Sequence, residues 1–279
     1  MANYTAADIK ALRERTGAGM LDVKKALDEA DGDSEKALEI IRIKGLKGVS
    51  KREDRAASDG LVAASIVDGD SGQRGVLVEV NSETDFVAKN DTFVQLAERA
   101  VTAASDSDAQ DAEALLQVDI EGRSLQEIVD ETAATLGEKL VVRRLARVEG
   151  EVVTEYLHRT SRDLPPQVGV LVASDEAAGS VARDVAMHIA AYSPTYLSSE
   201  DVPEDLVADE RRIAEETARA EGKPEKAMPK IIEGRLNGFF KENVLLDQPF
   251  ARDPKKTVGQ IVNEAGGKIT GFVRFRVGA

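Results

Sequence analysis

The chain has 279 residues, with 37 Lys or Arg and 51 Asp or Glu, so its formal net charge is −14. This acidity argues against a general nucleic-acid-binding protein, because such proteins present a basic surface. The chain has no Cys and only two His, His158 and His188. This composition excludes disulfides, thiolate metal sites and cysteine nucleophiles, and it disfavours a His-rich metal or acid–base site.

Hydropathy and charge distribution bear on where the chain acts and how it is divided. The first residues lack a basic-then-apolar signal pattern, and no run of about 18 apolar residues occurs. We therefore expect a cytoplasmic protein without membrane contacts. Residues 1–56 carry 12 basic and 11 acidic side chains, a net charge of +1, whereas the remainder carries −15. The asymmetry predicts a separate amino-terminal unit with its own contact surface.

Residues 1–56 are predicted to form three short helices and a linker. Thr5 with Asp8 resembles a capping box at the start of the first helix, and two glycines separate this helix from a second over about 20–29. The third helix is expected to end near Lys44. A basic stretch of small residues follows, and its lack of interleaved aromatic residues favours a linker over a nucleic-acid-binding arm.

From residue 60 onward the spacing of apolar residues changes to every second position. Residues 61–67 and 76–80 flank a turn at 68–72, which predicts a β-hairpin. An amphipathic helix is then predicted from the spacing of Phe93, Leu96, Ala97, Ala100 and Val101.

The core of the chain is predicted to contain two copies of one α/β unit. Three blocks recur in the same order: 74–78 as 168–172, 124–131 as 257–264, and 137–140 as 266–269. Agreement in both order and element type favours duplication over a chance similarity of short apolar strands.

The second copy is interrupted by residues 200–242, which are predicted to form a protruding antiparallel helical hairpin with a break at 221–224. Leu206, Ile213 and Ala220 recur every seven residues in its highly charged first half. The predicted fold class is therefore α+β: a three-helix module, two duplicated α/β subdomains and an inserted hairpin. The expected boundaries are 1–56 for the module and linker, 57–148 for the first subdomain, 149–199 with 243–279 for the second, and 200–242 for the hairpin.

Sequence signatures of enzymes are mostly absent. The chain has no phosphate-binding G-x-x-x-x-G-K-[ST] loop, no G-x-G-x-x-G after a strand, no G-x-S-x-G and no His pair at metal spacing. We expect no catalytic residue, no cofactor and no metal.

One polar connection between a strand and a helix, residues 81–90, stands out because it contains Phe86 in a chain with only 4% aromatic residues. Two interpretations stay open here. Phe86 either folds back onto the helix as a core residue, or inserts into a partner while Asp85 disturbs polar contacts there.

Four motifs carry a family resemblance. They are RTGAGMLDVKKAL at 15–27, TDFVAK at 84–89, MHIAA at 187–191 and GFVRF at 271–275. In this order and at this spacing the chain resembles the bacterial elongation factor Ts family. The resemblance implies an amino-terminal module like the ubiquitin-associated domain. It also implies a non-enzymatic function in translation elongation: guanine-nucleotide exchange on the GTPase elongation factor Tu.

The resemblance also implies which residues contact the partner. The segment that enters a pocket near the partner's magnesium site corresponds to Thr84, Asp85, Phe86 and Val87. Contacts of the amino-terminal module with the partner's nucleotide-binding domain correspond to Arg13, Met20, Leu21 and Lys24. His158 corresponds to a contact of the second subdomain with another domain of the partner. Val23 stands where the family often has Cys, and we expect it to be buried.

Two rival functions remain at this stage. A scaffold protein would recruit a partner through the three-helix module without exchange activity. An enzyme with a site of scattered carboxylates is disfavoured, because the acidic residues lie mostly on predicted exposed helical faces. The sequence also leaves open a homodimer within a 2:2 complex with elongation factor Tu, and it indicates no direct binding of nucleic acid.

Overall fold

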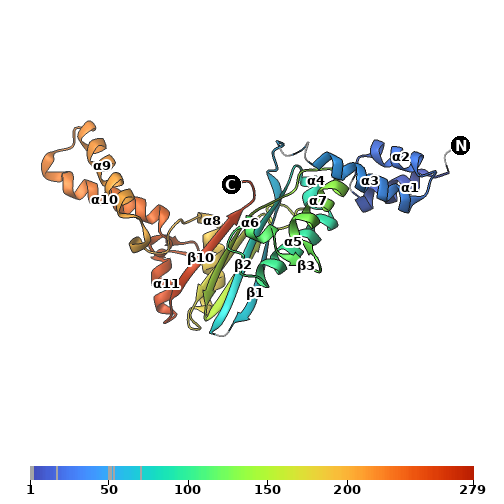
Figure 1. Ribbon diagram of the computed structural model, residues 1–279. Helices are drawn as coiled ribbons and strands as arrows, with labels where there is room; N and C mark the ends of the chain where they lie inside the picture. The colour runs from blue at the N-terminus through green and yellow to red at the C-terminus, as the bar shows by residue number, and fades with distance from the viewer. Residues whose placement is uncertain (1–2, 17, 50–51, 53, 70) are drawn as a thin grey trace.

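The structure is a computed structural model that describes every residue except 1–2, 17, 50–51, 53 and 70. Gly17, Lys51 and Asp70, which the sequence assigned to a helix break, a linker and a turn, lie outside the described residues. The molecule is elongated, with three amino-terminal helices at one end and a helical hairpin at the other (Figure 1).

The three amino-terminal helices confirm the prediction. They are α1 (Ala6–Thr16), α2 (Met20–Glu29) and α3 (Ser34–Val49). At the start of α1 the Thr5 N–H donates to the Asp8 carboxylate (2.6 Å), and the Asp8 N–H donates to the Thr5 hydroxyl (3.3 Å), as a capping box requires. A small apolar core holds the helices together, made of Leu12, Ala18, Val23, Ala26, Leu27, Ala30, Ala37 and Ile41.

The first half of the core is a three-stranded antiparallel sheet with helices on one face. Its elements are β1 (Asp59–Gly69), β2 (Gly72–Ser82), α4 (Asp85–Ala88), α5 (Asp91–Ser105), α6 (Ala112–Leu116), β3 (Asp119–Ile120), β4 (Arg123–Ser124), α7 (Leu125–Leu136) and β5 (Val141–Gly150). The strand order is β1-β2-β5. The predicted hairpin and the predicted helix are both present, and Phe93 and Leu96 of α5 are buried against the sheet.

Helix α3 continues beyond Lys44, so the prediction of a linker is wrong for residues 45–49. This part of α3 lies against α7 at Gly45, where a Cβ would come within 1.9 Å of the backbone oxygen of Ala134. An ion pair between Arg42 and Glu131 (2.8 Å) crosses the same contact. Glycine in this stretch therefore permits a close approach of two helices rather than marking a flexible segment.

The second half of the core repeats the first. It consists of β6 (Val152–His158), β7 (Val168–Ser174), α8 (Gly179–Tyr192), α11 (Val258–Glu264) and β10 (Ile269–Arg276), with the strand order β6-β7-β10. Helices α7 and α11 begin with equivalent capping boxes, formed by Ser124 with Glu127 and by Thr257 with Gln260. The duplication predicted from the sequence is therefore confirmed in both topology and local detail.

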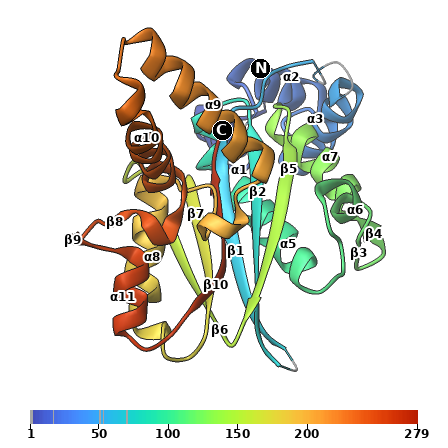
Figure 2. The same cartoon turned by 90° about the vertical axis from the view of Figure 1, so that its left-hand side faces the viewer.

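The two sheets pack against each other through the faces that the helices leave open (Figure 2). Gly75 of β2 faces Leu171 of β7, and a Cβ at Gly75 would lie 3.0 Å from the leucine Cδ1. The relation is reciprocal, because a Cβ at Gly169 would lie 2.9 Å from Cδ1 of Leu77. Each repeated glycine thus makes room for a leucine of the other sheet, and this interface joins the halves into one body.

The inserted hairpin protrudes from the second half (Figure 1). It contains η2 (Ser199–Asp201), α9 (Glu204–Ala220), η3 (Glu225–Ala227) and α10 (Met228–Asn243), and it is followed by η4 (Leu245–Asp247), β8 (Pro249–Phe250) and β9 (Asp253–Thr257). The heptad-spaced residues of α9 do not form its packed face, because Ile213 and Ala220 are exposed. Ala214 and Ala218 are buried instead, and their small side chains let α10 lie close.

Candidate functional site

The connection between β2 and α5 presents one aromatic side chain to solvent. Thr84 caps the single-turn helix α4, and its hydroxyl accepts a hydrogen bond from the Val87 N–H (3.4 Å). Val87 and Ala88 are buried in the core of the first half, whereas Phe86 is 50% exposed. The interpretation of Phe86 as a core residue is therefore wrong. Val87 and Ala88 occupy the core-facing positions of this turn, so the Phe86 ring points outward.

Two cations flank the Phe86 ring, and one of them belongs to the amino-terminal helices. The guanidinium carbon of Arg13 on α1 lies 5.8 Å from the ring centroid, and Nζ of Lys89 lies 5.8 Å from it as well. At such distances a cation is attracted to the face of an aromatic ring. A hollow of about 650 Å³ lies here between α1 and the start of α5. The structure thus brings together Arg13 and Phe86, which the sequence analysis assigned to separate contact regions.

Helix α2 supplies the other amino-terminal residues expected to contact a partner. It buries Val23, as expected, and leaves Met20, Leu21 and Lys24 exposed. The exposed fractions of Met20 and Leu21 are 59% and 72%. Two adjacent large apolar side chains with this exposure are typical of a surface that binds another protein.

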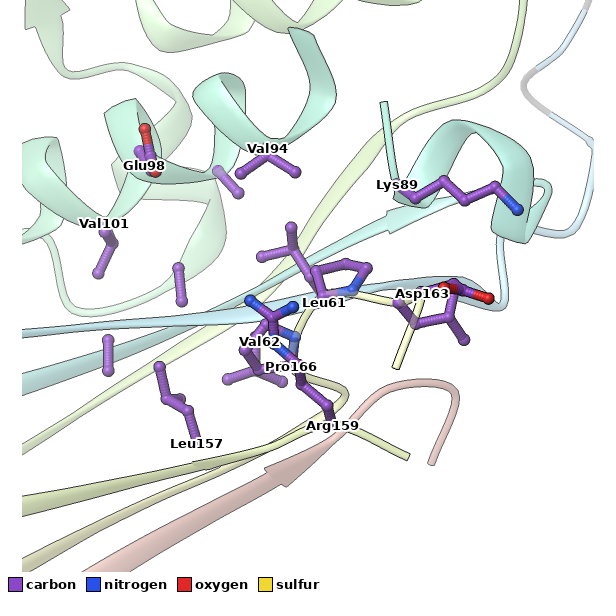
Figure 3. Close-up of a pocket in the computed structure, with 15 residues that line it drawn as sticks. Leu61, Val62, Lys89, Val94, Glu98, Val101, Leu157, Arg159, Asp163 and Pro166 are labelled. Carbon is purple, nitrogen blue, oxygen red and sulfur yellow. The ribbon is translucent and has the colours of Figure 1, made fainter. Parts of the chain in front are cut away.

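His158 ends strand β6 in the second sheet, away from the Phe86 segment. Its ring is exposed, and its Nδ1 lies 3.1 Å from the hydroxyl of Tyr156. The preceding residue, Leu157, lines a cavity of about 390 Å³ that reaches Lys89 between β1 and α5 (Figure 3). Successive side chains of a strand point to opposite faces. His158 therefore points away from this cavity, and the structure does not bring it to Phe86.

Glu138 lies directly beside this segment, although no motif in the sequence marked it. Its carboxylate accepts hydrogen bonds from the backbone N–H groups of Glu83 (3.1 Å) and Thr84 (3.0 Å). Burial raises the pKa of Glu138, although the hydrogen bonds from Thr84 oppose the change. The sequence offers one signal for Glu138, which is the internal repeat. The repeat aligns Glu138 with Gly267, so the first half has a carboxylate where the second half has none.

Comparison with known proteins decides the family. The family described as Elongation factor TS matches residues 83–279 of the chain. Proteins named elongation factor Ts from Beutenbergia cavernae, Renibacterium salmoninarum and Micrococcus luteus are 72%, 66% and 65% identical to it, and each match covers 100% of both sequences. The chain belongs to the elongation factor Ts family. It is therefore a translation elongation factor, and the resemblance carried by the four motifs is confirmed.

Two further observations describe this member of the elongation factor Ts family. Among the residues that the structure describes, no group of three or more His, Cys, Asp or Glu side chains is arranged to hold a metal ion. None of the described helices combines the length and the apolar composition that a membrane crossing requires.

Proposed function

We propose that the chain is a non-enzymatic guanine-nucleotide exchange factor, which binds elongation factor Tu and promotes the release of GDP during translation elongation. Its membership in a family of translation elongation factors supports this proposal, and so does the exposed aromatic ring of Phe86. Because translation elongation takes place in the cytoplasm, we also propose a cytoplasmic location. No cofactor enters the proposed mechanism.

Nucleotide exchange needs no catalytic acid or base. A factor that binds the nucleotide-free GTPase more tightly than the nucleotide-bound form weakens nucleotide binding by the same factor. In a GTPase, magnesium and a phosphate-binding loop hold the nucleotide, and magnesium requires nearly ideal octahedral coordination. A side chain inserted beside that site therefore lowers the affinity for GDP without touching the nucleotide. We assign the insertion to Phe86 and the disturbance of neighbouring polar contacts to Asp85.

The internal duplication supports the assignment of Phe86. Counted from the matching strands β2 and β7, Ser180 occupies the position of Phe86, and Ala182 the position of Ala88. Both alanines are buried, and Ser180 is exposed like Phe86. The fold consequently does not need an aromatic ring at the exposed position. An exposed ring where the other copy has serine is the single observation that best supports a contact with a partner.

The other contacts are assigned by family resemblance and by exposure. Arg13, Met20, Leu21 and Lys24 are proposed to bind the nucleotide-binding domain of the GTPase, because Arg13 already adjoins Phe86 and the other three are exposed on the neighbouring helix. His158 is proposed to bind another domain of the partner. Its position on a different face of the core agrees with a partner that contacts two sides of this protein.

The test times the release of a fluorescent GDP analogue from elongation factor Tu. Wild-type chain, Phe86→Ala and Tyr192→Ala are compared, since Tyr192 is also an exposed aromatic residue but lies on α8. We expect wild type and Tyr192→Ala to accelerate release alike. Phe86→Ala should be slower by about thirtyfold, because an interface residue of this kind contributes about 2 kcal/mol.

Melting temperatures measured on the same samples verify that each variant is folded. Equal acceleration by wild type and Phe86→Ala would refute the role of Phe86. Binding of elongation factor Tu by the wild-type chain without any acceleration would refute exchange and favour a scaffold protein.

A further inference from the structure

We propose that Glu138 is a positioning residue for nucleotide exchange, whose carboxylate holds the start of α4 and so sets the direction in which Phe86 projects. This inference rests on the proposed function of Phe86 in exchange. Helix α4 spans only four residues, from Asp85 to Ala88, and so short a helix depends on interactions from outside itself.

The hydrogen bonds of Glu138 end on the residues that begin α4. Glu138 follows Gly137, which ends α7 in the left-handed conformation (φ 79°). One carboxylate oxygen accepts the N–H groups of Glu83 and Thr84, and the other accepts the hydroxyl of Thr84 (2.5 Å). Because that hydroxyl donates its only proton to Glu138, it presents a lone pair to the N–H of Val87. Glu138 thereby orients the group that caps α4.

A second carboxylate makes the connection reciprocal. Glu83 accepts hydrogen bonds from the Lys139 N–H (2.7 Å) and from the guanidinium of Arg55 (3.3 Å). The loop before α4 and the loop after α7 are therefore bonded in both directions. Hydrogen bonds to ionised carboxylates are stronger than neutral ones, so rotation of the first loop has to break several strong contacts together.

The second half of the core closes the equivalent junction without a carboxylate at the position of Glu138. Gly267 occupies the position of Glu138, and a Cβ there would lie 2.3 Å from the backbone nitrogen of Ala178, the residue that matches Thr84. The Ala178 N–H donates instead to Asp175 of its own loop (2.9 Å). The Asp175 carboxylate also accepts a backbone hydrogen bond from Lys268. The duplicated fold thus does not require a carboxylate at the position of Glu138. Of the two halves, the one that presents Phe86 has a carboxylate at this position.

The experiment compares Glu138→Ala and Glu138→Gln with the matched control Glu127→Ala. The Glu127 carboxylate also accepts a backbone hydrogen bond, from Ser124 (2.9 Å), but at the opposite end of α7 from Glu138. Each full-length variant is assayed for its melting temperature and for the rate of fluorescent GDP release from elongation factor Tu at saturating concentration of the variant. We expect all three substitutions to lower the melting temperature and only the Glu138 substitutions to slow release.

The expected slowing for Glu138→Ala is about tenfold, which corresponds to about 1.4 kcal/mol. Glu138→Gln should be slowed less, because its carbonyl oxygen still accepts the two backbone N–H groups. It also serves as the informative variant if Glu138→Ala does not fold. Slowing of release by Glu127→Ala to the same extent would overturn the positioning role, because a general loss of stability would then explain the effect.

A double-mutant cycle with Phe86→Ala separates positioning from other effects. If Glu138 acts through Phe86, Glu138→Ala slows release in the wild-type background and changes nothing in the Phe86→Ala background. Equal slowing in both backgrounds, or none in the wild-type background, would overturn the inference and leave the role of Phe86 intact. A wild-type chain that does not accelerate GDP release would instead overturn the proposed function itself.

Discussion

The substitution Gly45→Ala tests whether the amino-terminal helices are held on the core by direct contact between two helix backbones. A Cβ at this position would lie 1.9 Å from the carbonyl oxygen of Ala134 and 2.4 Å from its carbonyl carbon. Both atoms belong to the backbone of α7, so a change of side-chain rotamer cannot relieve the overlap. Helix α3 has to move away by more than about 1 Å to restore an ordinary van der Waals distance.

The size of the effect follows from two opposing contributions. In a helix interior, replacing Gly by Ala stabilises by up to about 1 kcal/mol. Forcing an extra methyl group into a packed contact costs about 1–3 kcal/mol. Gly234→Ala in α10 is the matched control, because a Cβ there would meet no atom within 4 Å. The difference in unfolding free energy between the two variants isolates the cost of the overlap, which we expect to be about 1–3 kcal/mol.

Chemical denaturation measures this difference, and amide hydrogen exchange locates it. We expect Gly234→Ala to match or exceed the stability of wild type. Gly45→Ala should lose protection in α3 and keep protection in the sheet strands, because the overlap affects only the docking of the amino-terminal helices. Equal stabilisation by both substitutions, with protection of α3 unchanged, would refute the close contact between α3 and α7.

Two further predictions concern the second half of the chain. Burial lowers the pKa of His188, whose Nε2 bonds to Gln248 (2.8 Å) and whose Nδ1 accepts the Ala251 N–H (3.2 Å). Since the pKa of His188 in the folded chain lies below the unfolded value of about 6.5, the fold favours the neutral ring. The stabilisation that the neutral ring contributes is complete above the unfolded pKa and is lost as the pH falls. The fall in melting temperature from about pH 7.5 to about pH 5 should therefore be shallower in His188→Gln, and an unchanged slope would contradict the argument. Removal of residues 200–242 should leave one cooperative thermal transition of the remaining chain. The reason is that the two ends of the hairpin are already joined at its base, where the Thr195 N–H donates to the Asn243 carbonyl (2.8 Å). A broad, non-cooperative transition would show that the core depends on the hairpin.

Local sequence patterns were sufficient to predict most elements of the fold. The capping residues Thr5 and Asp8, the alternating strands of the first hairpin and the apolar stripe of α5 each depend on interactions within a few residues. The duplication was also predictable, because a strand, a capped helix and a glycine recur in order. The end of α3 was predicted wrongly, because glycine and lysine in that stretch are equally compatible with a linker and with a helix that approaches another helix closely.

The candidate site depended much less on local patterns. The sequence marked Phe86 as unusual but left open whether its ring was buried, because the direction of a side chain at a single turn depends on which neighbours reach the core. Burial of Val87 and Ala88 decides the question. The contribution of Glu138 could not be foreseen from spacing, since its partner Thr84 lies in a distant part of the sequence.

The sequence by itself determined the family, the order of the elements, the duplication and the acidic character of everything after the amino-terminal helices. These properties follow from composition and from sequence patterns that each span a few residues. Only the tertiary structure decided that Arg13 lies over the Phe86 ring, that His158 faces elsewhere, and that Glu138 bridges to the start of α4. The physical reason is that such contacts join residues far apart along the chain, and their geometry depends on the packing of whole helices and sheets.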